Sequence, residues 1–196
     1  MIQEENKVVF IHIPKTAGTS MGRALGFTTQ CHKTPAMEPN SEHWNKQYFK
    51  FAFTRHPFDR FLSAYFYHFE MFKKKPTKQR ELIYKTGNSV DSFNYFISKL
   101  AYPSYLRRNV KKDLWFRDQC FWLFGKSLYE YDFIGRFERL EKDFKYIQEK
   151  LQINLKLTHK NKTKRMHFQN YYTQKSKKII TNLYERDFNF LGYKQS

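Results

Sequence analysis

Short apolar runs alternate along the chain with stretches whose apolar residues recur at helical spacing. The run at 7–13, KVVFIHI, is rich in β-branched residues and ends at Pro14, which predicts a buried strand of a parallel sheet. Residues 15–25 follow as a turn of small residues and a stretch that can start a helix with a hydroxyl residue at its N-cap. Strand, tight turn and helix in this order are typical of the opening of a nucleotide-binding α/β unit.

The same order of elements occurs a second time. The run at 48–53, YFKFAF, predicts a strand, and a charged turn follows it. Pro57 suits the first turn of a helix. The next apolar residues recur at helical spacing. They are Phe58, Phe61, Leu62, Tyr65 and Phe69.

The rest of the chain continues the alternation of strands and helices. Further strands are predicted at 131–135 and 154–158. Helices are predicted at 91–100, 117–124, 137–151 and 174–188, and loops at 28–46, 73–80 and 159–165. This order predicts a P-loop-like three-layer α/β/α fold in which helices flank a central, mostly parallel sheet. We expect residues 1–196 to form a single domain.

Charge and composition narrow the class of protein. The chain has 36 Lys and Arg against 18 Asp and Glu, a net charge of +18, and 19% of its residues are aromatic. Disordered basic tails carry few aromatic residues, so the charge argues instead for a folded protein with an anionic partner. Cys31 and Cys120 are too few for a disulfide framework and lack zinc-ligand spacing. With neither a signal-peptide pattern nor an apolar run of membrane-spanning length, we expect a cytoplasmic protein, for which peripheral membrane association stays open.

The first turn, PKTAGTS, has the residues of a phosphate-binding loop. Lys15 adds a positive charge, Thr16, Thr19 and Ser20 add hydroxyl donors, and Gly18 lets the main chain approach an anion. The lysine comes before the glycine, so the turn is not a Walker A loop. An ordinary turn between a strand and a helix is the alternative.

The second turn places a further cation at the same sheet edge. Arg55 follows the strand at 48–53 and offers a bidentate fork for a phosphate group, and Ser63 could add a hydroxyl from the helix. The carboxyl ends of parallel strands meet at one edge of a sheet, where ligands bind. Two anion sites at one edge suggest a ligand with two separated phosphate-like groups. Packing roles for Arg55 and Ser63 are equally compatible with the sequence.

Four segments together carry a family resemblance. In chain order they read FIHIPKTAGTS, FKFAFTRHPFDRFLSAY, DFIGRFERLEKDF and HKNKTKRMHFQNYY. This series resembles the carbohydrate sulfotransferase family in its bacterial form and is similar to the heparan sulfate 2-O-sulfotransferase group. The resemblance implies in-line transfer of a sulfuryl group from 3′-phosphoadenosine 5′-phosphosulfate to a hydroxyl of a carbohydrate acceptor, without a metal ion.

The resemblance also implies roles for individual residues. The 5′-phosphosulfate would be held by the first loop, which consists of Lys15, Thr16, Ala17, Gly18, Thr19 and Ser20. Arg55 and Ser63 would hold the 3′-phosphate. Further donor contacts are expected from the basic loop at Lys162, Thr163 and Lys164, for which a solvated loop is the alternative. Lys15 would also stabilise charge on the leaving phosphate oxygen.

A general base has to accept the proton of the acceptor hydroxyl, and histidine is the usual choice near neutral pH. The resemblance places the base at His32, within a segment that partly matches the family pattern, and His43 is the alternative. His12 lies within the first predicted strand, which favours a structural role. His56 is next to Arg55, where it could line the pocket without acting as the base, and His68 lies on a predicted helix. Gln119 is expected to face the acceptor cleft.

Two other functions compete with sulfuryl transfer. A P-loop-like nucleotide-binding kinase or hydrolase would need a Lys-Ser or Lys-Thr pair directly after the glycine, and none is present. A basic nucleic-acid-binding module fits the charge but lacks a recognition motif, so we expect no nucleic-acid partner. The acceptor is expected to be a carbohydrate or another hydroxyl-bearing molecule, an acidic polymer included. The sequence leaves the oligomeric state open.

Overall fold

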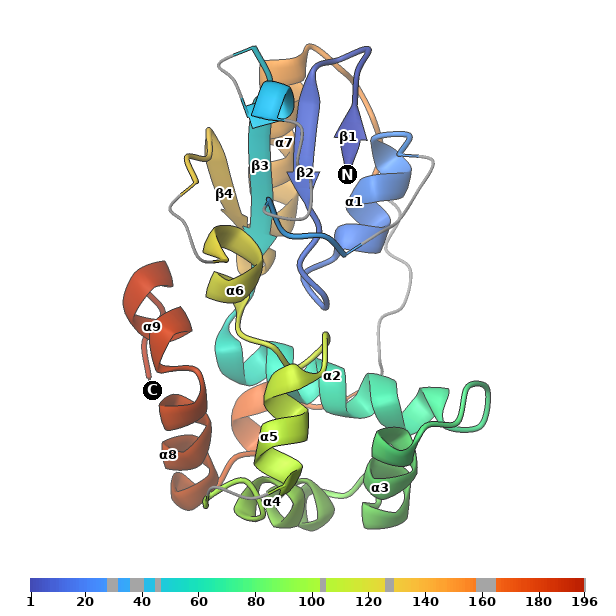
Figure 1. Cartoon of the computed structure of the whole chain (residues 1–196), viewed down its shortest axis with the longest axis vertical. Coiled ribbons are helices and arrows are strands. Elements are labelled where there is room, and N and C mark those ends of the chain that lie inside the picture. Colours follow the sequence, from blue (N-terminus) through green and yellow to red (C-terminus); the bar gives the residue numbers. More distant parts are fainter. Residues whose placement is uncertain are drawn as a thin grey trace. The chain divides into compact units, whose positions relative to one another are not determined.

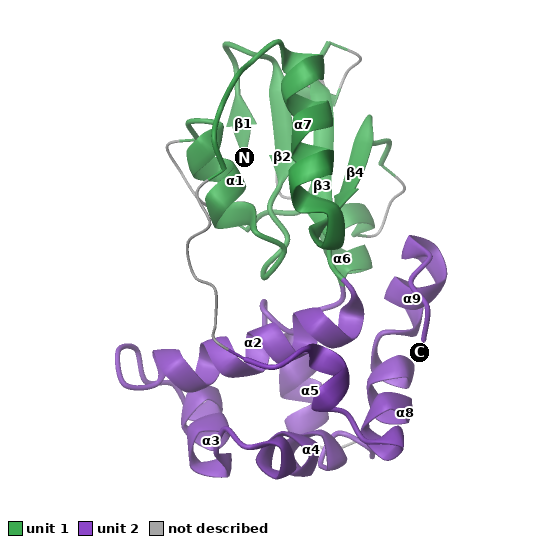
Figure 2. Cartoon of the chain, turned by 180° about the vertical axis from the view of Figure 1, so that it is seen from behind, with its two compact units in different colours: residues 1–55, 119–162 green, residues 56–118, 163–196 purple. Residues whose placement is uncertain are grey.

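The computed structural model (Figure 1) describes residues 1–27, 32–35, 41–44, 47–102, 105–125, 129–157 and 165–195. These residues form two compact units, which are distinguished by colour in Figure 2. Unit 1 consists of Met1–Arg55 and Gln119–Lys162, and unit 2 consists of His56–Asp118 and Thr163–Ser196. Each unit therefore combines two separate stretches of the chain.

Unit 1 contains a four-stranded sheet in the order β1-β2-β3-β4. The strands are β1 (Ile2–Gln3), β2 (Val8–Ile11), β3 (Phe49–Thr54) and β4 (Phe133–Arg136). The three longer strands are parallel, with Phe10 beside Phe51 and Phe53 beside Gly135, whereas β1 is antiparallel to β2. The carboxyl ends of β2, β3 and β4 therefore meet at one edge, as the sequence predicts.

Helices cover the sheet because the strands are apolar on both faces. Val8 and Phe10 of β2 and Phe51 and Phe53 of β3 share a buried cluster with residues of two helices, α1 (Gly18–Ala24) and α7 (Leu140–Leu151). Figures 1 and 2 place α6 (Gln119–Phe124) on the opposite side of the sheet from α7. Two 3₁₀ helices lie in connecting segments of the unit, η2 (Ser41–Trp44) and η3 (Phe137–Arg139). The predicted α/β fold with a mostly parallel sheet between helices is confirmed.

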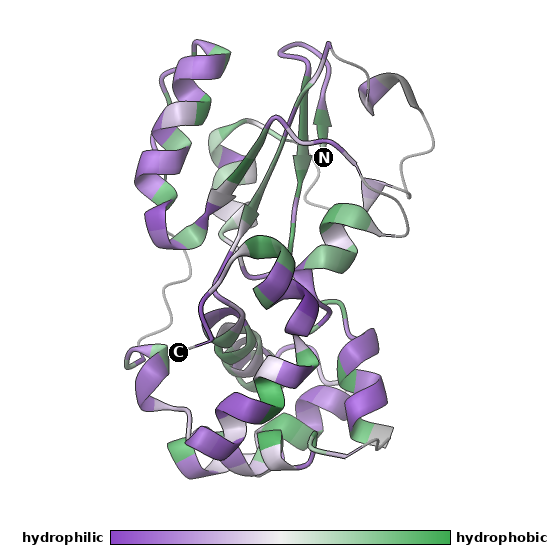
Figure 3. Ribbon diagram, turned by 90° about the vertical axis from the view of Figure 1, so that its left-hand side faces the viewer, coloured by the Kyte–Doolittle hydropathy of each residue, from purple (hydrophilic) through white to green (hydrophobic). Residues whose placement is uncertain are grey.

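Unit 2 is helical in the residues described. Its helices are α2 (Pro57–Met71), α3 (Lys78–Thr86), α4 (Val90–Ser98), α5 (Tyr105–Lys112), η4 (Phe168–Asn170), α8 (Gln174–Leu183) and α9 (Glu185–Leu191). The core is largely aromatic, with Phe61 and Tyr65 of α2 packed on Phe93 and Phe96 of α4. Apolar and polar residues alternate along these helices (Figure 3), as expected for helices that bury one face.

Several predicted boundaries are wrong. Residues 154–157 form no strand, and residue 158 lies outside the described residues. The predicted loop at 73–80 ends early because Thr77 caps α3 by accepting a hydrogen bond from the Arg80 main chain. The predicted helix at 174–188 is divided into α8 and α9 at Tyr184, whose hydroxyl donates to the carbonyl oxygen of Phe116. The sequence reasoning missed β1, α3 and α5.

The start of α1 also differs from its prediction. Its N-cap is Ala17, and no side chain caps it, where a hydroxyl residue was expected. Ala17 has a φ of 68° and Lys15 a φ of 71°, so the chain passes twice through the left-handed region before the helix begins. The usual capping side chain therefore does not occupy the N–H groups of the first turn.

Candidate active site

The turn after β2 is built around a buried threonine. The hydroxyl of Thr16 donates to the carbonyl oxygen of Ile13 at 3.0 Å, and the residue is 1% exposed. This bond closes the turn between the strand and α1. The side-chain donor of Thr16 therefore stabilises the turn itself, and any contact of Thr16 with an anion would come from its main chain.

Gly18 is required by its neighbour His12. A Cβ atom at Gly18 would lie 1.8 Å from Cδ2 and 2.1 Å from Nε2 of the His12 ring. On its other side, His12 stacks on Phe10 with the ring centroids 5.9 Å apart. The sequence analysis assigned the glycine to close approach of an anion. The structure gives a different reason for it, which is the space that His12 occupies.

Arg55 connects the end of β3 to this turn. Its guanidinium donates from Nη1 to the carbonyl oxygen of Lys15 at 3.0 Å, and its Cζ lies 3.8 Å from the centroid of the Phe137 ring. The Arg55 main chain forms two hydrogen bonds with the side-chain amide of Gln119. Gln119 is fully buried, so the expectation that it faces an acceptor cleft is wrong.

His32 lies beside His12. The two ring centroids are 4.1 Å apart, and His32 Nδ1 donates to the main-chain carbonyl oxygen of His12 at 2.9 Å. Burial lowers the pKa of His32, the hydrogen bond to the His12 carbonyl opposes this in part, and the nearby positive charge of Lys15 adds to the lowering. The pKa of His12 is lowered well below its ordinary value, by burial first and then by the charge of His32. Both imidazoles are therefore neutral at pH 7, with the Nε2 lone pair of His32 as an acceptor.

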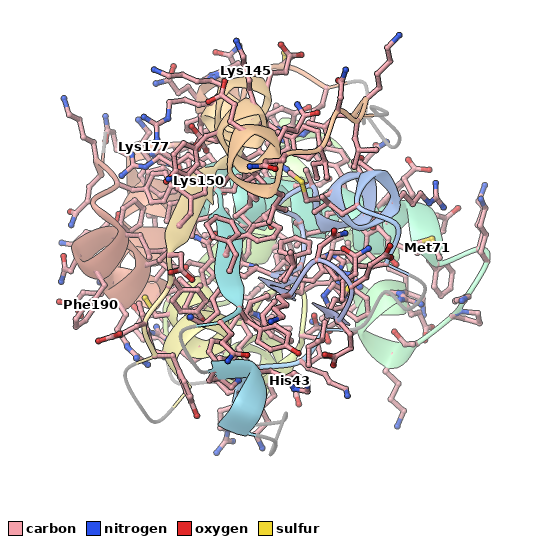
Figure 4. The ribbon with its side chains drawn as sticks, turned by 90° about the horizontal axis from the view of Figure 1, so that it is seen from above. His43, Met71, Lys145, Lys150, Lys177 and Phe190 are labelled. Atoms are coloured by element: carbon pink, nitrogen blue, oxygen red, sulfur yellow. The ribbon has the colours of Figure 1, made fainter. Side chains whose placement is uncertain are left out.

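The remaining histidines considered for the base are engaged elsewhere. His43 Nε2 bonds Glu4 at 2.8 Å at the amino end of the strands, which faces the viewer in Figure 4. In unit 2, His56 Nε2 lies 3.1 Å from the carbonyl oxygen of Lys194, and His68 is buried 3.3 Å from Asp113. Because His43 is at the far end of the strands from Lys15, the alternative base does not lie with the first turn.

The structure thus brings part of the predicted site together. Lys15 to Ser20, His32 and Arg55 all belong to unit 1. Ser63 belongs to α2 of unit 2, where it is 7% exposed, so its role stays a prediction. Lys162, Thr163 and Lys164 lie outside the described residues, as does Cys31. The sequence reasoning missed Phe137, although its place two residues after a predicted strand was a usable signal.

The described segments contain neither a group of metal ligands nor a helix of membrane-spanning character. No three His, Cys, Asp or Glu side chains in these segments are grouped so that they could hold a metal ion. No helix among the described residues combines the length and apolar character needed to cross a membrane. Cys120 is a buried thiol.

Comparison with known proteins gives one family and several relatives. The model of the family described as "Sulfotransferase family" matches residues 1–194, which span both units. Carbohydrate sulfotransferase 11 of Rattus norvegicus and of Mus musculus are each 26% identical over 182 residues, covering 75% of this chain and 51% of the relative. Carbohydrate sulfotransferase 14 of Danio rerio is 26% identical over 175 residues, covering 77% of this chain and 47% of the relative. The chain therefore spans about half the length of these curated relatives, and no solved structure matches it significantly.

Proposed function

Because the chain belongs to the sulfotransferase family, we propose that it transfers a sulfuryl group from 3′-phosphoadenosine 5′-phosphosulfate to a hydroxyl of a carbohydrate acceptor. The family resemblance drawn from the four sequence segments is confirmed, whereas the likeness to the heparan sulfate 2-O-sulfotransferase group stays a prediction. The observation that carries the proposal is the grouping of Lys15, Arg55 and a neutral His32 at one edge of the unit 1 sheet.

Three features of unit 1 support binding of this donor. The first turn of α1 lacks a side-chain cap, so its N–H groups suit an anion, and Lys15 adds a positive charge beside them. Arg55 lies at the end of the neighbouring strand and contacts the same turn. Two cationic groups on adjacent strand ends fit a nucleotide with separate 5′ and 3′ anionic groups. Lys15 to Ser20 would hold the first group, and Arg55 with Ser63 the second.

His32 and Lys15 would have different roles in the transfer step. The donor supplies an activated sulfuryl group. His32 would accept the acceptor proton on Nε2 as the acceptor oxygen forms its bond to sulfur and the sulfur–oxygen bond to the phosphate breaks. Lys15 would stabilise the electron pair that stays on the phosphate oxygen. The hydrogen bond from His32 Nδ1 to His12 supports this role because it leaves Nε2 unprotonated.

The charge distribution supports an acidic acceptor. Unit 2 contains 20 of the 36 Lys and Arg residues but only 8 of the 18 Asp and Glu residues, a net charge of 20 − 8 = +12. Most of the excess charge therefore lies outside the unit that holds the donor loop. A basic surface speeds the encounter with a polyanion, and salt screens it. Transfer to an acidic glycan should therefore slow as ionic strength rises, whereas transfer to a neutral glycan of the same length should not.

Ligand binding and transfer test the proposal together. We expect 3′-phosphoadenosine 5′-phosphate to raise the melting temperature well above the effect of ATP at the same concentration. Incubation with sulfate-labelled donor and a panel of neutral and acidic glycans should then label at least one glycan. An equal or larger shift with ATP, together with no labelled glycan, would contradict the proposed function.

A further inference from the structure

Arg55 is held by residues from three separate segments of unit 1. Gln119 Oε1 accepts a hydrogen bond from the Arg55 main-chain N–H at 2.8 Å, and Gln119 Nε2 donates to the Arg55 carbonyl oxygen at 2.8 Å. The Phe137 ring lies 3.8 Å from the guanidinium carbon, and the Lys15 carbonyl oxygen accepts from Nη1 at 3.0 Å. Both the main chain and the side chain of Arg55 are therefore fixed.

The two hydrogen bonds to Gln119 continue the sheet by one residue. The pairing of β3 with β4 ends at Thr54 and Arg136, so Arg55 lies just beyond the ladder. Arg55 is 8% exposed, and its buried N–H and carbonyl groups need partners. The primary amide of Gln119 supplies one acceptor and one donor, each 2.8 Å from its partner on the Arg55 main chain. Because Gln119 is fully buried, its amide is itself held in place.

Phe137 acts on the other end of the same residue. It follows β4 directly, and its ring face meets the guanidinium in a cation–π contact. Such a contact restricts the plane of the guanidinium, and that plane sets the direction in which its fork points. A fork that is oriented before binding loses less conformational entropy when it meets a planar or bidentate anion.

We propose that Gln119 and Phe137 are positioning residues for Arg55 and set the preference of the site for nucleotides that carry a phosphate on the ribose 3′-oxygen. The inference rests on the proposed function because it takes Arg55 as the ligand of that phosphate. Neither residue is assigned a contact with the nucleotide. They affect binding by fixing the direction of the Arg55 guanidinium and the position of the Arg55 main chain.

The test compares two nucleotides that differ only in the 3′-phosphate. Calorimetry gives the Kd of adenosine 3′,5′-bisphosphate and of adenosine 5′-monophosphate for each protein, and the ratio of the two is the readout. The wild type should prefer the bisphosphate. Gln119→Glu removes the donor to the Arg55 carbonyl and should lower that preference about 10-fold. Phe137→Leu removes the ring face and should lower it about 3-fold.

Matched variants separate positioning from general damage. Gln148→Glu makes the same chemical change at a glutamine of α7 that bonds the Leu155 main chain at 2.7 Å, away from Arg55. Phe133→Leu removes a ring that packs on Tyr146 at the start of β4. Both controls should keep the wild-type preference, and a loss of overall stability would weaken both nucleotides alike.

The outcomes distinguish this inference from the proposed function. A wild type without a preference for the bisphosphate would contradict the donor assignment, and the inference with it. A wild-type preference that persists in folded Gln119→Glu and Phe137→Leu proteins would overturn the inference alone. If Gln119→Glu does not fold, Phe137→Leu decides the question, because a change from Phe to Leu keeps most of the apolar volume.

Discussion

His32 donates its Nδ1 proton to the main-chain carbonyl oxygen of His12, across 2.9 Å and twenty residues of sequence. This bond fixes the tautomer of His32, since a nitrogen that donates must carry the hydrogen. The other nitrogen, Nε2, is then the acceptor. The His12 ring lies 4.1 Å from the His32 ring, and His12 in turn packs against Gly18 of the first turn. The proposed base and the proposed phosphate-binding turn are thus linked through one buried histidine.

Removing the proposed base should slow transfer. His32→Ala should lower kcat on the order of 10²-fold or more, because no other group would accept the acceptor proton as well. Steady-state rates with labelled donor measure the loss. His43→Ala is the matched control, since His43 bonds Glu4 at the amino end of the strands and should keep the wild-type rate. A loss of rate in His43→Ala and not in His32→Ala would assign the role of general base to His43.

The pH dependence of the reaction should follow the lowered pKa of His32. Burial and the charge of Lys15 favour the neutral imidazole, so the pKa of His32 is lower than its ordinary value. We expect kcat/KM to stay level through pH 7 and to fall only at lower pH, as His32 becomes protonated. NMR titration of the imidazole measures the same pKa directly. In Lys15→Met the pKa of His32 should rise, and an unchanged value would exclude the influence of Lys15.

The buried histidine pair should also make the fold sensitive to acid. Both pKa values are lower in the folded protein than the value of about 6.5 expected in the unfolded chain. The unfolded state therefore binds more protons in this range, and stability is complete above about pH 6.5 and is lost as pH falls below it. Each histidine contributes at most about 1.4 kcal/mol per pH unit.

His12→Phe should flatten this dependence. Urea unfolding at pH 7 and pH 5 gives the change in unfolding free energy for each protein. His12→Phe should lose less stability between the two pH values than the wild type, whatever its absolute stability. Equal slopes for His12→Phe and the wild type would show that His12 does not take part in the acid sensitivity.

Lys15 should matter for the reaction more than for the fold. Lys15→Ala removes the charge that we place on the leaving phosphate oxygen, which should lower kcat on the order of 10²- to 10³-fold. Lys7→Ala is a close control, because Lys7 is also a lysine in the left-handed region, with a φ of 47°, but lies before β2. Both variants should melt at similar temperatures, and only Lys15→Ala should lose transfer. Normal transfer by Lys15→Ala would show that Lys15 has no role in the reaction.

The contact between Gly18 and His12 should appear as an energetic coupling. Gly18→Ala places a Cβ inside the space of the His12 ring and should destabilise the protein by about 1–3 kcal/mol through overpacking. In a His12→Ala background that space is open, so the same substitution should cost less. A double-mutant cycle by urea unfolding measures the difference. Additive effects would mean that the glycine is required for another reason.

The local pattern of the chain was sufficient for the strands and helices with strong periodicity. The predicted strands at 7–13, 48–53 and 131–135 correspond to β2, β3 and β4, because runs of apolar β-branched and aromatic residues have few other stable places than a buried sheet. The local pattern did not predict the helix boundary that coincides with a long-range contact. Tyr184 divides a continuous helical pattern at the point where its hydroxyl reaches Phe116, sixty-eight residues away.

The sequence by itself determined the order of β2, β3 and β4 and of the helices that follow them, the family, and the chemical character of Lys15, Arg55 and His32, since these depend on residue type and spacing along the chain. Only the tertiary structure places His32 beside His12 and His43 beside Glu4, toward opposite ends of β2, because these hydrogen bonds join residues that are far apart in the sequence. That His32 is the base stays a prediction. The tertiary structure also decided the places of Gly18 and Gln119. Their roles are set by the His12 ring and the Arg55 main chain, which are neighbours in space that spacing along the chain does not reveal.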